Sequence, residues 1–490
     1  MLRKIRITLA VIFMLAITLL FLDFTGGLHK YLGWSANVQL FPALLASNIL
    51  IVTGLLLVTF MLGRIYCSVI CPLGIFQDIV SRTGKKNRFF YRPSRKAVEI
   101  SRYVILAVFA FAGINAVTVL LEPYSAYGRM ASQILGPIYM YGNNILAYIA
   151  ERIDSYAFYT VEIWLSSALA LAVAVLTTVA VGIFAVKSGR GYCNSVCPIG
   201  TLLSIFAKHS MIKVRIDSEK CNKCGLCAKK CKASCIDTAN GEIDYSRCVV
   251  CFNCLEKCPK DAIKYNLKTM EPPSASSAPI NTTRRGVVSG VVLFTLGLFS
   301  RAFSAYQFDG GLAPLEDKKI PNRQKPIIPA GSNNIRNFTR RCTSCHLCVS
   351  TCPNQVLRPS KSLSRFLQPE MSFERGYCRP ECVKCSEVCP TGAIQHITTA
   401  EKSATQIGYA VLKRDLCVVT RDNVTCDLCE TKCPTAAITL IPQTADGDGL
   451  AKIPMIDTNR CIGCGACENL CPARPDSAIY VEGIEDHRRV

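Results

Sequence analysis

The chain has 490 residues, of which 50% are hydrophobic, and its mean hydropathy of +0.27 excludes an ordinary soluble protein and indicates membrane spans. Its formal net charge is +21, but the basic residues cluster beside the apolar runs, which favours anionic lipid headgroups and acidic redox partners over nucleic acid. The 29 cysteines recur in tight quartets within a large chain, so they indicate metal chemistry rather than the disulfides of a small secreted protein.

Four apolar runs in the first half of the chain are each long enough to cross about 30 Å of hydrocarbon. They are Ile5–Phe24, Phe41–Leu62, Tyr103–Leu121 and Val161–Val186. Nine basic residues lie between the second and third runs, whereas the segment between the first and second holds only Lys30. Because cytoplasmic loops carry the excess of Lys and Arg, we expect the N-terminus in the cytoplasm. Residues 1–205 are predicted to form a four-helix membrane domain of two repeated hairpins.

One motif occurs twice, at Gly63–Gly74 and again 126 residues later at Gly189–Gly200. Each copy contains C-x3-C-P at the end of an apolar run, and such self-similarity marks a duplicated unit. Cysteines spaced i and i+4 lie on one face of a helical turn, so two copies related by a pseudo-twofold axis would present four thiolates to one another. These are Cys67, Cys71, Cys193 and Cys197. We expect an iron–sulfur site there on the cytoplasmic side; the alternative is four small thiols that pack helices together.

Residues 206–270 are polar and carry two cysteine quartets with the spacing C-x2-C-x2-C-x3-C. The quartets are Cys221, Cys224, Cys227 and Cys231, and Cys248, Cys251, Cys254 and Cys258. This spacing wraps a [4Fe-4S] cluster, whereas structural zinc prefers two separated C-x2-C pairs. In two-cluster ferredoxins the fourth cysteine of each motif serves the other cluster, so Cys258 and Cys231 should exchange places. Cys235 is expected to be a small residue packed near a cluster rather than a ligand.

Residues 271–285 form a linker by composition and end in a twin arginine, Arg284 and Arg285, which precedes an apolar run at 286–305. This start resembles a twin-arginine export signal. Such a signal, or a plain fifth membrane span, would place everything after a second linker at 306–335 in the periplasm. An interfacial helix would instead leave it in the cytoplasm.

Residues 336–490 hold four more quartets. They are Cys342, Cys345, Cys348 and Cys352; Cys378, Cys382, Cys385 and Cys389; Cys417, Cys426, Cys429 and Cys433; and Cys461, Cys464, Cys467 and Cys471. Two regularly spaced quartets enclose two irregular ones, which suggests pairing of the first with the fourth and the second with the third. Cys342–His346 also matches the C-x-x-C-H haem pattern, but haem would leave Cys348 and Cys352 without a role. Short strands are expected at Ala437–Ile441 and Lys452–Ile456.

Ionisable residues at the ends of membrane spans are candidates for function. Glu122 closes the third run and Glu162 opens the fourth, both at the predicted outer face. Tyr124 and Tyr127 follow Glu122 closely and could hold a quinone oxygen. These four residues are the predicted (mena)quinone site. The alternatives are ordinary residues of the interfacial aromatic belt, or a quinone site at the inner face beside Cys67.

The whole chain resembles a fusion of two known subunits. Residues 1–270 resemble the NapH-type membrane ferredoxin of periplasmic nitrate respiration in their four runs, two C-x3-C-P motifs and two-cluster domain. Residues 281–490 resemble the NapG/MauM-type polyferredoxin, best in Gly408–Leu412 and Thr425–Cys429. The resemblance implies an α-helical membrane domain with α+β ferredoxin-like 2[4Fe-4S] domains, which passes electrons from (mena)quinol to a periplasmic reductase or cytochrome.

Six quartets predict six [4Fe-4S] clusters, with the C-x3-C-P cysteines as a possible seventh site. The expected protein is a multi-pass component of the bacterial inner membrane in an anaerobic respiratory chain, and an electron-transfer subunit of a quinol dehydrogenase if it is an enzyme. Its expected partners are membrane lipid, the quinone pool and the extracytoplasmic acceptor. One alternative is a FixG-like metal-ion reductase or assembly factor, although only 5 histidines argue against it. Another is a redox-sensing regulator.

Overall fold

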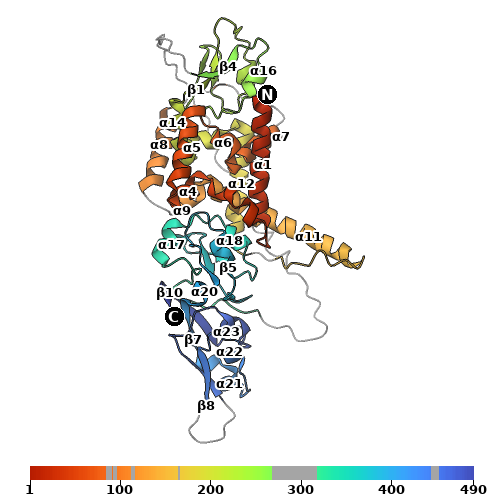
Figure 1. Ribbon diagram of the computed structural model, residues 1–490, viewed down its shortest axis with the longest axis vertical. Coiled ribbons are helices and arrows are strands. Elements are labelled where there is room, and N and C mark those ends of the chain that lie inside the picture. The colour runs from red at the N-terminus through yellow and green to blue at the C-terminus, as the bar shows by residue number, and fades with distance from the viewer. Residues whose placement is uncertain (84–90, 92–95, 112–115, 164–165, 268–316, 443–451) are drawn as a thin grey trace, which may run out of the picture.

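Three parts of the chain are stacked along one long axis in the computed structural model, which describes residues 1–83, 91, 96–111, 116–163, 166–267, 317–442 and 452–490. A small ferredoxin-like part lies at one end, a helical domain in the middle and the C-terminal part at the other end (Figure 1). The two ferredoxin-like parts therefore lie on opposite sides of the helical domain. The predicted linker at 271–285, the run at 286–305 and the first part of the linker at 306–335 lie outside the described residues.

The helical domain spans most of the first 208 residues. Its helices are α1 (Leu2–Leu22), α2 (His29–Leu32), α3 (Trp34–Asn37), α4 (Leu40–Leu45), α5 (Ile49–Leu62), α6 (Tyr66–Val69), α7 (Pro72–Thr83), α8 (Lys96–Phe111), α9 (Ala116–Leu121), α10 (Pro123–Met130), the π-helix η1 (Ala131–Leu135), α11 (Gly136–Glu151), α12 (Ala168–Ser188), α13 (Gly191–Ser195) and α14 (Pro198–Lys208). Among the described residues, α1 and α12 are long and apolar enough to cross a membrane, by length and composition alone.

The expected runs differ from the helices at two caps. The run at 41–62 is divided, because α4 ends at Leu45 and Asn48 caps α5 by accepting a hydrogen bond from the Ile51 amide at 3.3 Å. The run at 161–186 starts late, because Ser167 caps α12 through the Ala170 amide at 3.3 Å. Both caps are short polar side chains inside apolar sequence, which hydropathy averages conceal. Residues 112–115 of the third run lie outside the described residues.

The two sequence repeats exchange helices. α7 of the first repeat packs on α12 of the second, and α14 of the second packs on α5 of the first. Within each repeat the contacts also correspond, because α1 contacts α6 in the first repeat and α8 contacts α13 in the second. Pro72 and Pro198 begin α7 and α14, at the first helical position where proline has no hydrogen bond to lose. The duplicated motif therefore ends up at the centre of the domain, where the repeats meet.

The inner ferredoxin-like part, residues 212–267, consists of short elements around its cysteines. They are β1 (Ile212–Ile216), α15 (Leu226–Lys229), β2 (Ile236–Asp237), β3 (Glu242–Ile243), α16 (Asn253–Lys257) and β4 (Ile263–Leu267). β1 pairs antiparallel with β4, with Ile212 opposite Leu267, and β2 pairs antiparallel with β3. This pairing brings the two ends of the part together and leaves the cysteine loops between the sheets.

The C-terminal part, residues 317–490, repeats this arrangement on a larger scale. Its elements are α17 (Ile335–Arg341), α18 (Leu347–Ser350), β5 (Leu357–Pro359), the 3-10 helix η2 (Leu363–Arg365), β6 (Pro369–Met371), α19 (Lys384–Glu387), α20 (Thr399–Ser403), β7 (Thr405–Leu412), the 3-10 helix η3 (Arg414–Leu416), α21 (Val418–Arg421), α22 (Leu428–Thr431), β8 (Ile438–Pro442), β9 (Lys452–Ile456), α23 (Ala466–Leu470) and β10 (Ile479–Arg489). β8 and β9 confirm the two predicted strands, the first shifted by one residue, and they pair with each other.

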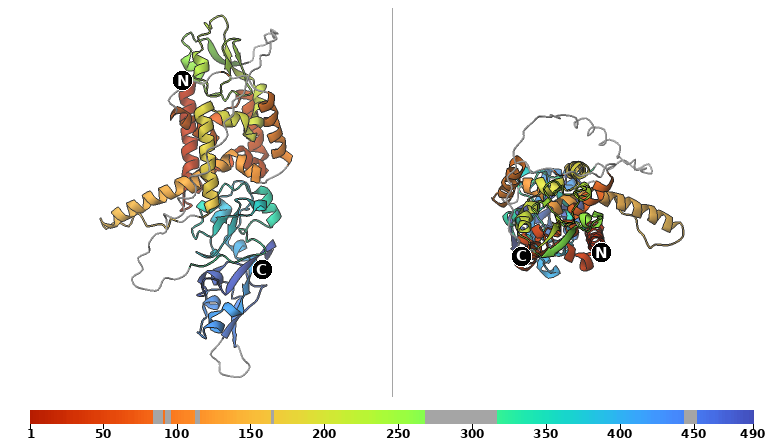
Figure 2. Two further views of the ribbon diagram at one scale, coloured as in Figure 1. Left: turned by 180° about the vertical axis from the view of Figure 1, so that it is seen from behind. Right: turned by 90° about the horizontal axis from the view of Figure 1, so that it is seen from above.

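One helix departs from the stack. α11 projects sideways from the outer end of the helical domain, and the chain then returns to α12 (Figure 2). Asn144 ties the returning segment to α11, donating to the Val161 carbonyl and accepting from the Val161 amide, both at 2.8 Å. This return places residues 159–163 and Ser166 against the C-terminal part.

Candidate metal centres

The cysteines of the inner ferredoxin-like part form two sets around two small cavities. Cys258 lines one cavity with Cys221, Cys224 and Cys227. Cys231 lines the other with Cys248, Cys251 and Cys254. The predicted exchange of the fourth cysteine is therefore confirmed as an arrangement of thiols. Four thiols around one small space fit the corners of a [4Fe-4S] cluster, for which they are the usual ligands.

Cys235 adds a fifth thiol to the second set. It is 1% exposed, and its Sγ lies 3.4 Å from that of Cys231. Hydrogen bonding to Cys231 and Cys248, together with burial, raises its pKa well above the ordinary value, while the same bond lowers the pKa of Cys231 to about 7. Cys235 therefore stays a neutral S–H donor to two thiolates, which suits the packed, non-ligating residue that the sequence predicts.

In the C-terminal part neighbouring quartets pair, so the predicted pairing of first with fourth and second with third is wrong. Cys433 lines a cavity with Cys461, Cys464 and Cys467. Cys389 lies beside the first three cysteines of the first quartet, and Cys352 lies beside Cys378 and Cys385. Cys417, Cys426, Cys429 and Cys471 are left for the fourth set by elimination, and all four belong to the distal core. Consecutive cysteine helices pack together, α18 on α19 and α22 on α23, whereas irregular spacing only lengthens a loop.

The four outer sets follow one another away from the helical domain. The Cys342 set meets that domain, because an added Cβ on Gly128 of α10 would lie 2.5 Å from the Cys345 carbonyl oxygen. The Cys378 set comes next and contacts the Cys461 set, where the Cys378 amide donates to the Cys464 carbonyl at 2.9 Å. The Cys417 set is most distant. At the other end, the Arg190 amide donates to the Lys232 carbonyl at 2.9 Å, beside Cys231.

Between these ends, the cysteines of the duplicated motif converge. All four are buried, at 3% to 4% exposure, and we call them the hub (Cys67, Cys71, Cys193 and Cys197). The thiols lie close enough for their charges to interact. Gln77 donates its Nε2 to the Cys193 sulfur at 3.2 Å, and the Gly200 amide donates to the Cys197 sulfur at 3.3 Å. Four converging thiols with such donors to sulfur are the kind of ligand set that a cluster requires.

Two arginines hold the hub together by reaching across the repeats. Arg64 donates its Nη2 to the Cys193 carbonyl at 3.2 Å, and Arg190 donates its Nη1 to the Cys67 carbonyl at 2.6 Å. Both side chains are fully buried. Their role was not among the predictions from sequence, although each stands three residues before the first cysteine of its motif copy, a repeated offset that could have identified them.

Asp78 anchors this network to its surroundings. Its carboxylate lies 2.9 Å from Arg6 of α1, 2.9 Å from Arg190 of the hub and 3.2 Å from Lys232 of the inner ferredoxin-like part. The side chain is 7% exposed. One buried carboxylate thus joins three separate parts of the chain.

The four predicted quinone-site residues do not share one cavity. Glu122 is 1% exposed and caps α10 by accepting from the Tyr124 amide at 3.0 Å. Tyr124 is buried among Phe21 and the Cys345 region, and Tyr127 shares a 2.6 Å hydrogen bond with a hydroxyl of α1. These three belong to a buried layer between the hub and the outer sets. Glu162 lies elsewhere.

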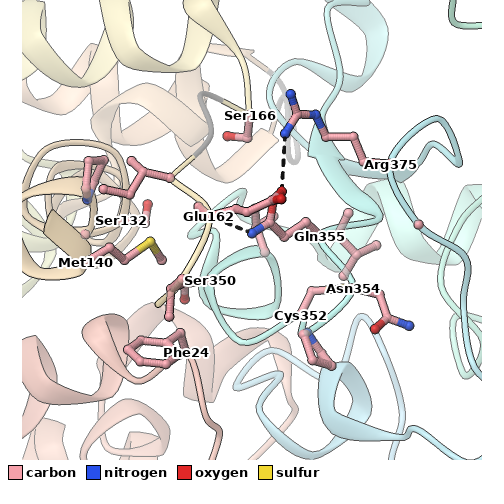
Figure 3. A pocket seen from close by; sticks show the side chains of 18 of the residues that line it. Phe24, Ser132, Met140, Glu162, Ser166, Ser350, Cys352, Asn354, Gln355 and Arg375 are labelled. Atoms are coloured by element: carbon pink, nitrogen blue, oxygen red, sulfur yellow. Dashed lines mark hydrogen bonds and ion pairs between the residues drawn. The ribbon is translucent and has the colours of Figure 1, made fainter. Parts of the chain in front are cut away.

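Glu162 instead lines a cavity of about 570 Å³ between the helical domain and the C-terminal part. Figure 3 shows its carboxylate facing Arg375, 3.9 Å away, while Gln355 donates to the Glu162 carbonyl at 3.3 Å. Apolar walls come from Phe24 and Met140, and Cys352 of the second outer set lies in the lining. This cavity brings together apolar walls, a carboxylate and a cysteine of the second outer set, a combination that the sequence did not reveal because its walls come from separate segments.

The buried layer also contains Arg129, which sequence analysis missed. Its Nη2 donates to the Val119 carbonyl at 2.9 Å, and its Nη1 donates to the Ser344 carbonyl of the first outer set at 3.3 Å. His346 lies nearby, and burial together with the Arg129 charge lowers its pKa to about 3, so the imidazole is neutral. Arg129 thus joins the helical domain to the loop that carries Cys345.

Two family models match the chain. A model described as a 4Fe-4S binding domain matches residues 44–89 and 169–217, and one described as a 4Fe-4S dicluster domain matches residues 341–420 and 424–474. The first match contains the four hub cysteines and ends before Cys221.

Several curated proteins are similar over part of the chain. The methylamine utilization ferredoxin-type protein MauM of Methylophilus methylotrophus is 30% identical over 171 residues, which is 33% of this chain and 72% of that protein. The ferredoxin-type protein NapG of Escherichia coli is 30% identical over 156 residues, 30% of this chain and 65% of that protein. An uncharacterized protein of Methanocaldococcus jannaschii is 24% identical over 266 residues, 54% of this chain and 94% of that protein. No solved structure matches the chain.

Proposed function

The chain belongs to the ferredoxin-type family of MauM and NapG, an iron–sulfur electron-transfer family, and from this premise we propose that it conducts electrons between the two ends of its helical domain. The observation that carries the proposal is the stacking of the cysteine sets. Two sets lie on one side of the helical domain, the hub lies within it and four sets lie on the other side. Bound [4Fe-4S] clusters would accept and release single electrons at these sets.

We propose that the hub is a seventh cluster site and links the two sides. Its thiols are buried, and the model described as a 4Fe-4S binding domain matches the segments that contain them. Arg64 and Arg190 bring two cations beside the thiolates, which offsets the cost of burying negative charge. The buried layer with Arg129 then fills the space between hub and outer sets. The residues of this layer would hold the hub and the outer cysteine sets at a fixed distance from each other.

We propose further that the first 270 residues act as a NapH-type membrane subunit with four spans, fused to the polyferredoxin. The membrane is the bacterial inner membrane, with the inner sets in the cytoplasm and the outer sets in the periplasm. Support comes from the basic residues between the second and third runs and from the placement of the two ferredoxin-like parts on opposite sides. A topology reporter fused after Val490 should behave as periplasmic, and one fused near Met270 as cytoplasmic. Both reporters on the same side would contradict this proposal.

The donor that we propose is a membrane quinol, which binds in the cavity lined by Glu162. Oxidation of a quinol releases two electrons and two protons. The exposed Glu162 carboxylate can receive a proton and pass it to water, and Cys352 offers the nearest cysteine set for the electrons. The acceptor that we propose is a periplasmic reductase or cytochrome, which docks near the distal Cys417 set, and the hub would connect this outer path to the two inner cysteine sets.

The test uses protein purified without oxygen. Seven sites predict about 28 iron atoms per chain, and loss of the hub predicts about 24. We expect Cys67→Ser/Cys193→Ser to lose that difference and to change the visible and electron paramagnetic resonance spectra. Unchanged iron content and spectra in this variant would show that the hub holds no cluster. To test the donor, Glu162→Gln should slow reduction of the clusters by a quinol analogue without loss of iron. Glu122→Gln tests in the same assay whether the buried layer takes part in that reduction.

A further inference from the structure

A second cavity lies at the inner end of the helical domain, where α1 and α7 meet the inner ferredoxin-like part. It has a volume of about 430 Å³ and is lined by five cations and two neutral polar side chains. The cations are Arg3, Arg82, Lys230, Lys232 and Lys257. None of the described residues that line it is a carboxylate. In Figure 1 the N-terminus, where Arg3 lies, is beside α16 and α7, as the 3.2 Å bond from Arg3 Nε to Asn253 requires.

The positive charge at this cavity exceeds the negative charge that the described residues supply. Asp78 forms an ion pair with Lys232, but the same carboxylate also forms ion pairs with Arg6 and Arg190. Glu256 is occupied by Arg3. Among the described residues, these two carboxylates make the ion pairs at the cavity. The cavity therefore carries an excess of positive charge that favours a further anion, most strongly beside the buried Lys232.

Lys232 identifies where that anion would bind. Its side chain is 9% exposed and lines the cavity, and its Nζ has no hydrogen-bond partner in the described part of the chain apart from the ion pair at 3.2 Å. An ammonium has three donors, and leaving buried donors unused costs free energy. An oxyanion in the cavity would accept from Lys232 at its floor, while the exposed Arg82, Lys230 and Lys257 would meet it at the rim.

The level of the cavity along the membrane normal indicates where the anion comes from. Arg3 lies in the first turn of α1, a 21-residue apolar helix long enough to cross a membrane. The start of such a helix lies at the level of the lipid headgroups. We propose that this cavity binds a phosphate-bearing anion, the headgroup phosphodiester of an anionic phospholipid from the inner leaflet. The bound lipid would join α1, α7 and the inner ferredoxin-like part at one point.

The experiment measures binding of short-chain phosphatidylglycerol to the intact, cluster-loaded protein in a neutral detergent. The rim variant Arg82→Gln/Lys230→Gln should bind about 25-fold more weakly, since each cation near an anionic headgroup contributes about fivefold. The control Lys220→Gln/Lys264→Gln removes the same charge from exposed sites on the same ferredoxin-like part, outside the cavity, and should bind as the parent does. If the double rim variant loses its clusters, Lys257→Gln alone should weaken binding about fivefold.

Three outcomes would overturn the proposal. Equal loss in the control variant would mean diffuse charge attraction rather than a site. Equally tight binding of zwitterionic phosphatidylcholine would show that the cavity does not select a lipid with net negative charge. Displacement of the lipid by inorganic phosphate at matching concentration would make free phosphate, rather than a phospholipid, the occupant.

Discussion

Replacing Asp78 by Asn should weaken the junction between the helical domain and the inner ferredoxin-like part. The carboxylate is the shared partner of Arg6, Arg190 and Lys232, at 2.9, 2.9 and 3.2 Å, and it is 7% exposed. Removing one partner of a buried ion pair costs about 3–5 kcal/mol, because it leaves uncompensated charge behind. For a domain of this size that corresponds to a fall of roughly 6–20 °C in Tm.

The assay is thermal unfolding of detergent-purified protein, followed by far-ultraviolet circular dichroism, which reports the helical domain. Asp78→Asn/Lys232→Met removes one orphaned cation and should recover part of the loss, whereas Lys232→Met alone should cost less than Asp78→Asn. A shift of about 2 °C or less for Asp78→Asn would correspond to a destabilisation of about 1 kcal/mol or less. Such a small shift would contradict this prediction.

Three further predictions follow from individual contacts. Gly128→Val should strain the interface with the Cys345 loop by about 1–3 kcal/mol and slow electron transfer to the outer sets, while the iron content is retained. Gly142→Val is the control, because an added side chain there meets open space and should have neither effect. Stopped-flow reduction would measure the rates. Cys235→Ala should keep the iron content but lower the reduction potential of the Cys231 set, because a donor to its sulfur is lost, and an unchanged titration would contradict this. Burial lowers the pKa of His487 to about 4, so this side chain binds a proton less readily in the folded protein than in the unfolded chain. The free energy of unfolding should therefore fall by up to roughly 3 kcal/mol as the pH drops from 6.5 towards 4. In denaturant titrations, His487→Leu should reduce this dependence on pH.

Much of the inner ferredoxin-like part was predictable from sequence, because cluster ligation fixes cysteine spacing. The exchange of Cys231 and Cys258 follows from that constraint, and so do the flanking strands of the outer part. The convergence of Cys67 and Cys193 was expected from the internal repeat, since two copies of one hairpin related by a pseudo-twofold axis bring their equivalent motifs together.

Other features depend on contacts between distant segments and could not be predicted. The pairing of the outer quartets is decided by the packing of α18 on α19 and of α22 on α23, which cysteine spacing does not encode. Glu122 and Glu162 have equivalent places at the ends of apolar runs, but the capping of α10 buries one and the returning segment after α11 exposes the other. Asn48 divides an apolar run that average hydropathy treats as continuous.

The central claim is that electrons pass through the hub from one side of the membrane to the other. It is tested most directly in proteoliposomes that contain the protein and a redox dye trapped in the lumen, with a membrane-impermeant reductant added outside. The parent protein should reduce the trapped dye, and Cys67→Ser/Cys193→Ser should not, although its six remaining cysteine sets are still reduced or oxidised from their own side. Equal rates of dye reduction in the parent and in this variant would contradict the account.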